Sequence, residues 1–245
     1  MTILPKKILV AVDFGEASAS AVAIGGELAA RTGAALWLMH AESLDAPPYF
    51  TPAQLQAIEG EERANQKRAG EYLRKFGRRQ TPQAFTTIVE SRTAVDAILY
   101  AARDADLIVM GTHGRRGPSR WWLGSVAERV LRETPVPLLV VHAGEEAARP
   151  QELFARGLLL VDAHTPAVRT RQLAGEIAAR AGGTVTEVAG EDAPAARARV
   201  NATWAAIPVP VPRTANWRSH VGEPLLQNCA IPVLFIPEAD GGPVR

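Results

Sequence analysis

The chain has 245 residues, enough for one large domain or two small ones. It is 47% hydrophobic and 22% charged, with 27 Lys and Arg against 26 Asp and Glu, so its net charge gives no reason to expect a nucleic acid as partner. A single cysteine, Cys229, excludes an internal disulfide and a cysteine-built metal site. The first residues do not resemble a signal peptide and no apolar run reaches the roughly 18 residues of a membrane helix. We therefore expect a cytoplasmic protein that does not bind a membrane.

Short apolar runs alternate with helical patterns through the first half of the chain. Strands are expected at residues 8–12, 35–41, 85–90, 107–110 and 138–141. Helices are expected from Ser18 or Ser20 to Gly33, from Thr51 to Gly77, over 93–102 and from Ser125 onward. This alternation predicts a doubly wound α/β fold, with a parallel sheet, right-handed crossovers and helices on both faces.

The second half of the chain repeats the first. The run 158–162 lies 149 residues after its match at 9–13, whereas 231–236 lies only 95 residues after its match at 136–141. The difference of 54 residues corresponds by position to the long second helix and the third strand. We therefore predict a tandem duplication, with one domain at 1–145 and a truncated second domain at 153–240 that lacks about one helix and one strand.

A glycine-rich segment follows the expected strand at 107–110. It contains Gly111, Gly114 and the pair Gly124-Ser125, which opens an amphipathic helix. Glycines let backbone N–H groups approach an oxyanion closely, and a helix N-terminus offers unpaired donors and a positive dipole end. The segment therefore predicts a phosphate site. In the second half, at the spacing of 95, the four positions read Ala206, Val209, Ser219 and His220, so we expect one such site per chain.

Several residues near this segment allow two interpretations. Asp13, which closes the first strand, either caps the next helix or touches a ligand. Ser125 can be a helix N-cap as well as a phosphate donor. The loop residues His113, Arg115, Arg116 and Arg120 either close over phosphates or lie exposed to solvent.

The pattern Gly111-x2-Gly114-x9-Gly124-Ser125, with Asp13 at the end of the first strand, resembles the nucleotide-binding subclass of the universal stress protein family. The resemblance implies Rossmann-like domains, related to the adenine nucleotide alpha hydrolases, with strand order 3-2-1-4-5 in the first. It also implies ATP as ligand, with AMP and ADP as alternatives. The site residues that it implies are Asp13 near the adenine or ribose, Ala41 at the adenine edge, Gly111 and Gly114 along the ribose and phosphates, and Gly124, Ser125 and Val126 at the phosphates.

The function expected from these observations is that of an ATP-binding protein of the stress response, with at most slow hydrolysis. No Walker motif is present, and neither a nucleophile–base pair nor a carboxylate pair for a metal is evident, so no catalytic residue is expected. The five histidines lack zinc-ligand spacing; Mg could accompany the phosphates. The alternatives are a nucleotide-free interaction module and an ATP-dependent enzyme of the ATPase or adenylating type. The apolar edge strands 138–141 and 233–236 are expected to pair within the chain, and a further homodimer is left open.

Overall fold

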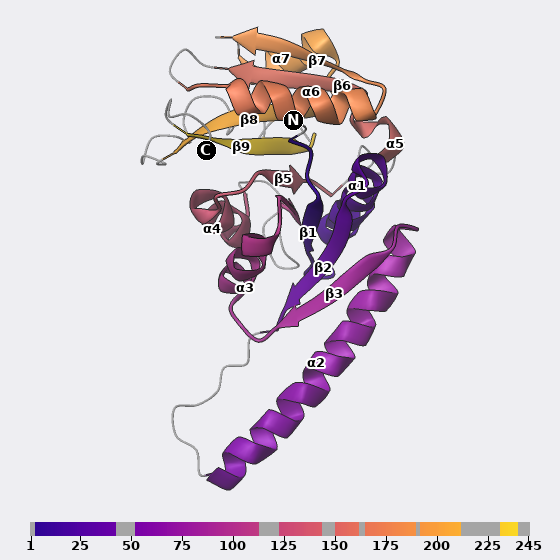
Figure 1. The fold of residues 1–245 in the computed structure, drawn as a ribbon, viewed down its shortest axis with the longest axis vertical. Coiled ribbons are helices and arrows are strands. Elements are labelled where there is room, and N and C mark those ends of the chain that lie inside the picture. The colour runs from indigo at the N-terminus through magenta and orange to yellow at the C-terminus, as the bar shows by residue number, and fades with distance from the viewer. Residues whose placement is uncertain are drawn as a thin grey trace.

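The computed structural model describes residues 3–42, 52–112, 123–143, 150–161, 165–189, 192–211 and 231–239. The first half comprises β1 (Lys7–Ala11), α1 (Glu16–Thr32), β2 (Ala35–Ala41), α2 (Pro52–Gln80), β3 (Phe85–Glu90), α3 (Ala94–Ala101), the 3-10 turn η1 (Ala102–Asp104), β4 (Leu107–Gly111), α4 (Ser125–Glu133) and β5 (Leu138–Val141). The second half comprises α5 (Pro150–Leu153), β6 (Arg156–Val161), α6 (Val168–Arg180), β7 (Thr184–Ala189), α7 (Ala193–Val200), β8 (Trp204–Val211) and β9 (Val233–Ala239). Figure 1 shows these elements along one continuous sheet.

The sheet has nine strands in the order β3-β2-β1-β4-β5-β9-β8-β6-β7. The strands of the first half are parallel and in the order 3-2-1-4-5, which confirms the expected fold class. Strands β6 to β9 are also parallel to one another. The two sets meet at β5 and β9, which pair antiparallel from Leu138↔Phe235 to Val140↔Val233. The sheet as a whole is therefore mixed, rather than parallel throughout.

Side chains on the two faces of this sheet form two hydrophobic cores. On one face Ile8 and Val10 of β1 lie in a cluster with residues of α1, α2 and α6. On the other face Leu9 lies with residues of α3, α4 and α7. Because alternate residues of a strand point to opposite faces, the continuous apolar strands supply both cores, and helices cover both sides of the sheet (Figure 1). No helix among the described residues is both long and apolar enough to span a membrane.

The second half is a shortened copy of the first, as predicted. Only residues 190–192 separate β7 from α7, where the first half has α2 and β3. Gly33 and Gly182, which are 149 residues apart, both follow a helix with a left-handed backbone, at φ 74° and 67°. The spacing of 95 holds for β5 and β9 but is wrong by two residues for β4 and β8. Leu107 pairs with Ile8 and Trp204 with Gly157, so the structural counterpart of Gly111 is Pro208 rather than Ala206.

Candidate functional site

A cavity of about 550 Å³ lies where β1, β2 and β4 end. Doubly wound sheets bind ligands at this edge, where the strand order reverses. The lining residues are Ala11, Val12, Asp13, Ser18, Met39, His40, Ala41, Ala94, Ile98, Met110, Gly111, Thr112, Gly124, Ser125, Val126 and Ala127. Six of the seven predicted site residues are therefore brought together around one space. The seventh, Gly114, lies outside the described residues, as do His113, Arg115, Arg116 and Arg120.

The turn between β1 and α1 is tightly hydrogen-bonded around Asp13. The Oδ1 atom of Asp13 accepts hydrogen bonds from the backbone N–H of Gly15, at 3.0 Å, and from the hydroxyl of Ser18. The Ser18 hydroxyl in turn accepts the N–H of Asp13 at 3.0 Å. Helix α1 consequently begins at Glu16, so Ser18 is not its N-cap but a buried first-turn residue that holds the Asp13 carboxylate at the rim of the cavity.

Phe14 turns the chain at this point with a φ of 65°, an uncommon conformation for a residue with a side chain. Its ring lies against His40 of β2, at 4.5 Å between centroids, and against Tyr72 and Phe76 of α2, at 4.7 and 5.4 Å. Nδ1 of His40 lies 2.7 Å from the carbonyl oxygen of Val12. That oxygen can only accept a hydrogen bond, so Nδ1 carries the proton and a neutral His40 has an acceptor at Nε2.

The N-terminus of α4 forms the opposite wall of the cavity. The helix starts at Ser125 after an N-cap at Gly124, and no side chain caps it. Its first backbone hydrogen bond runs from Glu128 to the carbonyl of Gly124, at 2.9 Å, so the N–H groups of the preceding turn have no partner within the helix. Buried Thr112 fixes this end in place, because its carbonyl accepts the N–H of Gly124 while its own N–H donates to Val141.

Gly111 has a packing reason to be glycine. A Cβ atom added there would lie 2.6 Å from the Cβ of Ala17 and 3.1 Å from its carbonyl carbon. Distances below 3.0 Å do not occur without a shift of one partner. Strand β4 and helix α1 can therefore approach this closely only with glycine at position 111, whether or not a ligand is bound.

Comparison with known proteins identifies the family. The universal stress protein family model matches residues 5–142, more than half of the chain and the whole region that forms this cavity. The chain belongs to the universal stress protein family. A universal stress protein of Thermus aquaticus is 34% identical over 143 residues, which cover 56% of this chain and 98% of that protein.

Solved structures of universal stress proteins share the fold. One from Archaeoglobus fulgidus matches with a TM-score of 0.65 and 16% identity over 98% of this chain and 99% of that one, so both halves have a structural counterpart there. Another universal stress protein, solved in complex with cAMP, covers 57% of this chain and 98% of its own at 25% identity and a TM-score of 0.39.

Sequence reasoning missed part of the lining of the cavity. The missed residues that bear on a ligand are Met39, His40, Ala94, Ile98, Met110 and Thr112. Ala94 and Ile98 are four apart on α3 and so share one helix face, and the other four lie within two residues of the last residue of a strand. Their positions relative to the strand ends could have identified them. Among the described residues no group of three or more His, Cys, Asp or Glu is placed to hold a metal ion.

In the second half of this universal stress protein an internal carboxylate occupies a helix N-terminus. Glu238, only 4% exposed at the end of β9, accepts the N–H and the hydroxyl of Thr170 at 2.6 Å each, and the N–H of Arg169 at 3.3 Å. These donors belong to the first turn of α6, the counterpart of α1. Asp162, which matches Asp13 in sequence, lies outside the described residues.

Proposed function

We propose that this protein binds one adenine nucleotide, ATP in the first instance, in the cavity of its first half. The observation that supports the proposal is that the cavity is lined on one side by apolar side chains and on the other by a helix N-terminus. An apolar wall is formed by Met39, Ile98 and Met110, and a helix N-terminus with unpaired N–H groups lies at Ser125. A base needs the first surface and a phosphate the second. The volume of about 550 Å³ is within the usual range for small-molecule sites.

The predicted site residues receive definite roles in this proposal. Both local hydrogen bonds of Asp13 end on Oδ1, so we assign Oδ2 to the ribose hydroxyls. The backbone of Ala41 is assigned to the adenine edge. Gly111 and Gly114 are assigned to the path between ribose and phosphates. The N-terminal turn of α4 is assigned to the phosphates, through Gly124, Ser125 and Val126.

We propose binding rather than turnover as the activity. Among the described lining residues Asp13 is the one carboxylate, and its Oδ1 is already engaged by the turn. A magnesium ion would then be held mainly by the phosphates of the nucleotide. Release of inorganic phosphate from ATP well above the rate of the buffer alone would favour the enzymatic alternative instead.

We further propose that residues 1–145 and 153–240 act as two domains held together through β5 and β9 in a cytoplasmic protein. Three residue pairs join these strands, and their side chains are buried in both cores. Slow hydrogen exchange at the amides of Val140 and Val233 is the expected result. Exchange of these amides at the rate of an unprotected strand edge would contradict the pairing. Light scattering would determine whether the chain also forms a homodimer.

The binding site is tested with a charge placed at the N-terminus of α4. Ser125→Asp adds a carboxylate where the phosphates are proposed to lie, while the helix dipole favours an acidic residue there. We expect the affinity for ATP to fall about tenfold, because repulsion between the new carboxylate and the phosphates of roughly 1.4 kcal/mol is modest for charges so close together. The affinity for adenosine should stay unchanged, since adenosine has no phosphate. Ser125→Asn, similar in size but neutral, is the control. Equal ATP affinity in the Asp and Asn variants, measured by isothermal titration, would refute the phosphate position.

A further inference from the structure

The positive charge of the chain is concentrated on one stretch of α2. Residues 63–79 contain seven basic side chains and a single acidic one, Glu71, for a net charge of +6. The whole chain has a net charge of only +1, so the rest of it is net −5. The other acidic residues of the same helix, Glu59, Glu61 and Glu62, all precede this stretch. Near-neutral overall composition therefore conceals a strong local asymmetry.

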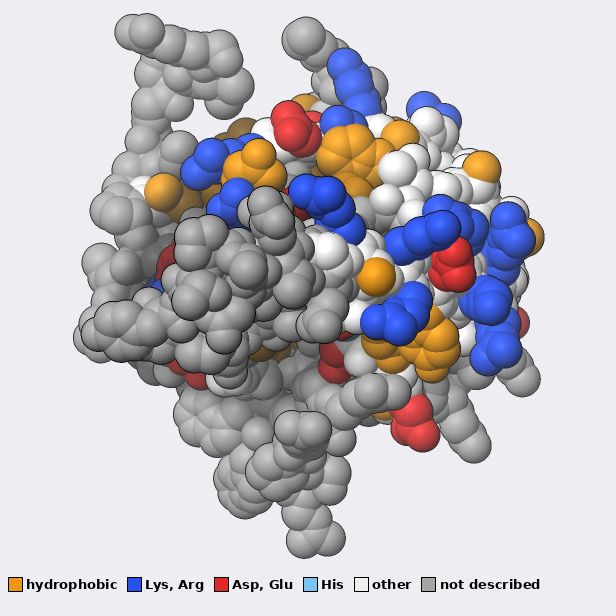
Figure 2. All heavy atoms as spheres, turned by 90° about the horizontal axis from the view of Figure 1, so that it is seen from below, with side chains coloured by type: hydrophobic (Ala, Val, Ile, Leu, Met, Phe, Trp, Pro, Cys, Tyr) orange, Lys and Arg blue, Asp and Glu red, His pale blue; other side chains and the backbone are white. Residues whose placement is uncertain are grey.

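These basic side chains share the outward face of the helix. At about 100° per residue, the residues 63, 67, 74 and 78 lie within about 60° of arc and 68, 75 and 79 lie beside them. All seven are exposed, whereas Leu73 and Gly77 on the other side are buried. We call this surface the basic face of α2, formed by Arg63, Lys67, Arg68, Arg74, Lys75, Arg78 and Arg79. Figure 2, seen from below, shows Lys and Arg side chains gathered with few carboxylates among them.

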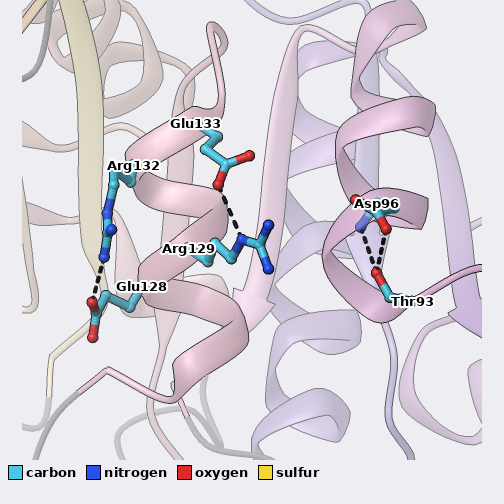
Figure 3. Close-up of polar contacts among 6 residues, drawn as sticks. All are labelled: Thr93, Asp96, Glu128, Arg129, Arg132 and Glu133. Carbon is cyan, nitrogen blue, oxygen red and sulfur yellow. Dashed lines mark hydrogen bonds and ion pairs between the residues drawn. The ribbon is translucent and has the colours of Figure 1, made fainter.

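On the exposed face of helix α4, by contrast, basic and acidic side chains form ion pairs with one another. Arg129 pairs with Glu133 at 3.1 Å and Arg132 with Glu128 at 2.7 Å, each four residues apart (Figure 3). On the basic face of α2, one glutamate stands among seven cations, so pairing of this kind within the stretch can serve at most one or two of them. The stretch as a whole keeps its net charge of +6, and such a surface attracts a polyanion.

We propose that the basic face of α2 binds the phosphate backbone of double-stranded nucleic acid. From Arg63 to Arg79 the helix extends about 24 Å at 1.5 Å per residue. Over that length of its axis a DNA duplex carries about fourteen phosphates on its two strands, at one per 1.7 Å, so several phosphates lie within reach of the basic face. Salt-dependent contacts with phosphates do not require a base sequence. The surface lies apart from the cavity and does not depend on nucleotide binding there.

The other polyanions fit this face less well. An amphipathic helix on a membrane inserts its apolar side into the lipid, but here the apolar side is already used, with Leu73 fully buried and Phe76 against Phe14. Single-stranded nucleic acid is held largely by stacking on aromatic side chains, and on the described part of α2 Tyr72 is the one exposed aromatic residue. A duplex backbone needs neither.

The experiment measures fluorescence anisotropy of a labelled 24-base-pair DNA duplex of random sequence, titrated with the full chain at several salt concentrations. We expect binding at low salt and a linear fall of log K with log salt, with a slope of about −0.9 for each phosphate contact. Arg74→Gln combined with Arg78→Gln should weaken binding at least tenfold at low salt and reduce the slope by about 1.8.

The matched control removes the same net charge from α4, where the arginines form ion pairs with glutamates. Arg129→Gln combined with Arg132→Gln on α4 should leave the affinity and the slope unchanged, with circular dichroism confirming that both double variants are folded. Equal loss in the two double variants would overturn the proposal, because net charge alone would then account for binding. Absence of binding at low salt would also overturn it, as would tighter binding to vesicles of anionic phospholipid than to the duplex.

Discussion

Removal of the buried carboxylate of Glu238 should destabilise the second half of the protein. Its two oxygens accept three hydrogen bonds from the first turn of α6. In Glu238→Ala the N–H groups of Arg169 and Thr170 lose their acceptor, and Thr170 is fully buried. The unsatisfied N–H of buried Thr170 costs about 1–3 kcal/mol, whereas Arg169 is exposed and water can replace its acceptor. The loss of an anion at a helix N-terminus adds about 1 kcal/mol. We expect a total loss of about 2–4 kcal/mol.

Urea and thermal unfolding monitored by circular dichroism would measure this loss. At about 2–4 °C per kcal/mol for a chain of this size, Tm should fall by about 5–15 °C. Glu238→Gln keeps one acceptor oxygen but directs an N–H₂ group at a donor, so it should fall between the wild type and the Ala variant. Glu187→Gln, which neutralises an exposed carboxylate paired with Arg171 of α6 and should cost no more than about 1 kcal/mol, is the control. A Glu238→Ala variant within about 0.5 kcal/mol of the wild type would refute the capping role.

Three further outcomes follow from the structure. Hydrogen bonds from Arg171 lower the pKa of the Glu187 carboxyl below its ordinary value. The pair should therefore stabilise the fold above about pH 4.3 and lose this contribution as the pH falls further, by no more than about 1 kcal/mol because both partners are exposed. A difference in unfolding free energy between the wild type and Glu187→Gln that persists at pH 3 would contradict this. Gly111→Ala should cost about 1–3 kcal/mol through overpacking against α1, whereas Gly175→Ala, where nothing lies within 4 Å, should not destabilise. Ser18→Ala should cost about 1 kcal/mol and weaken nucleotide binding, since Asp13 loses the hydroxyl that orients it; unchanged affinity would show that this contact does not orient a ligand group.

The strand order and the truncated repeat could be predicted because they depend on patterns spread over many residues. Buried strands of a parallel sheet are apolar throughout, and the change in spacing from 149 to 95 located the missing helix and strand. The two-residue error at β8 arose because 31 residues lead from Leu107 to Leu138 but only 29 from Trp204 to Val233. A spacing measured between the last strands of the two halves does not reveal a length difference in the segment that precedes them.

Local boundaries and roles were harder to predict because they depend on contacts between distant segments. Helix α2 continues past Gly77 to Gln80, since this glycine allows close packing on Leu38 and Phe85 rather than ending the helix. Gly111 likewise has a packing role that no local pattern reveals. The expected phosphate segment did fall beside Asp13 and Ala41 around one cavity, because the ends of parallel strands share one edge of the sheet.

The most direct test of the account is the stoichiometry of ATP binding. Isothermal titration of the intact chain with ATP should give one site per chain, because the cavity lies in the first half and the second half has Ser219 and His220 where Gly124 and Ser125 stand 95 residues earlier. Adenosine should bind at the same site more weakly, since it lacks the phosphates that the N-terminus of α4 is proposed to hold. No binding of ATP, or two sites per chain, would contradict the account.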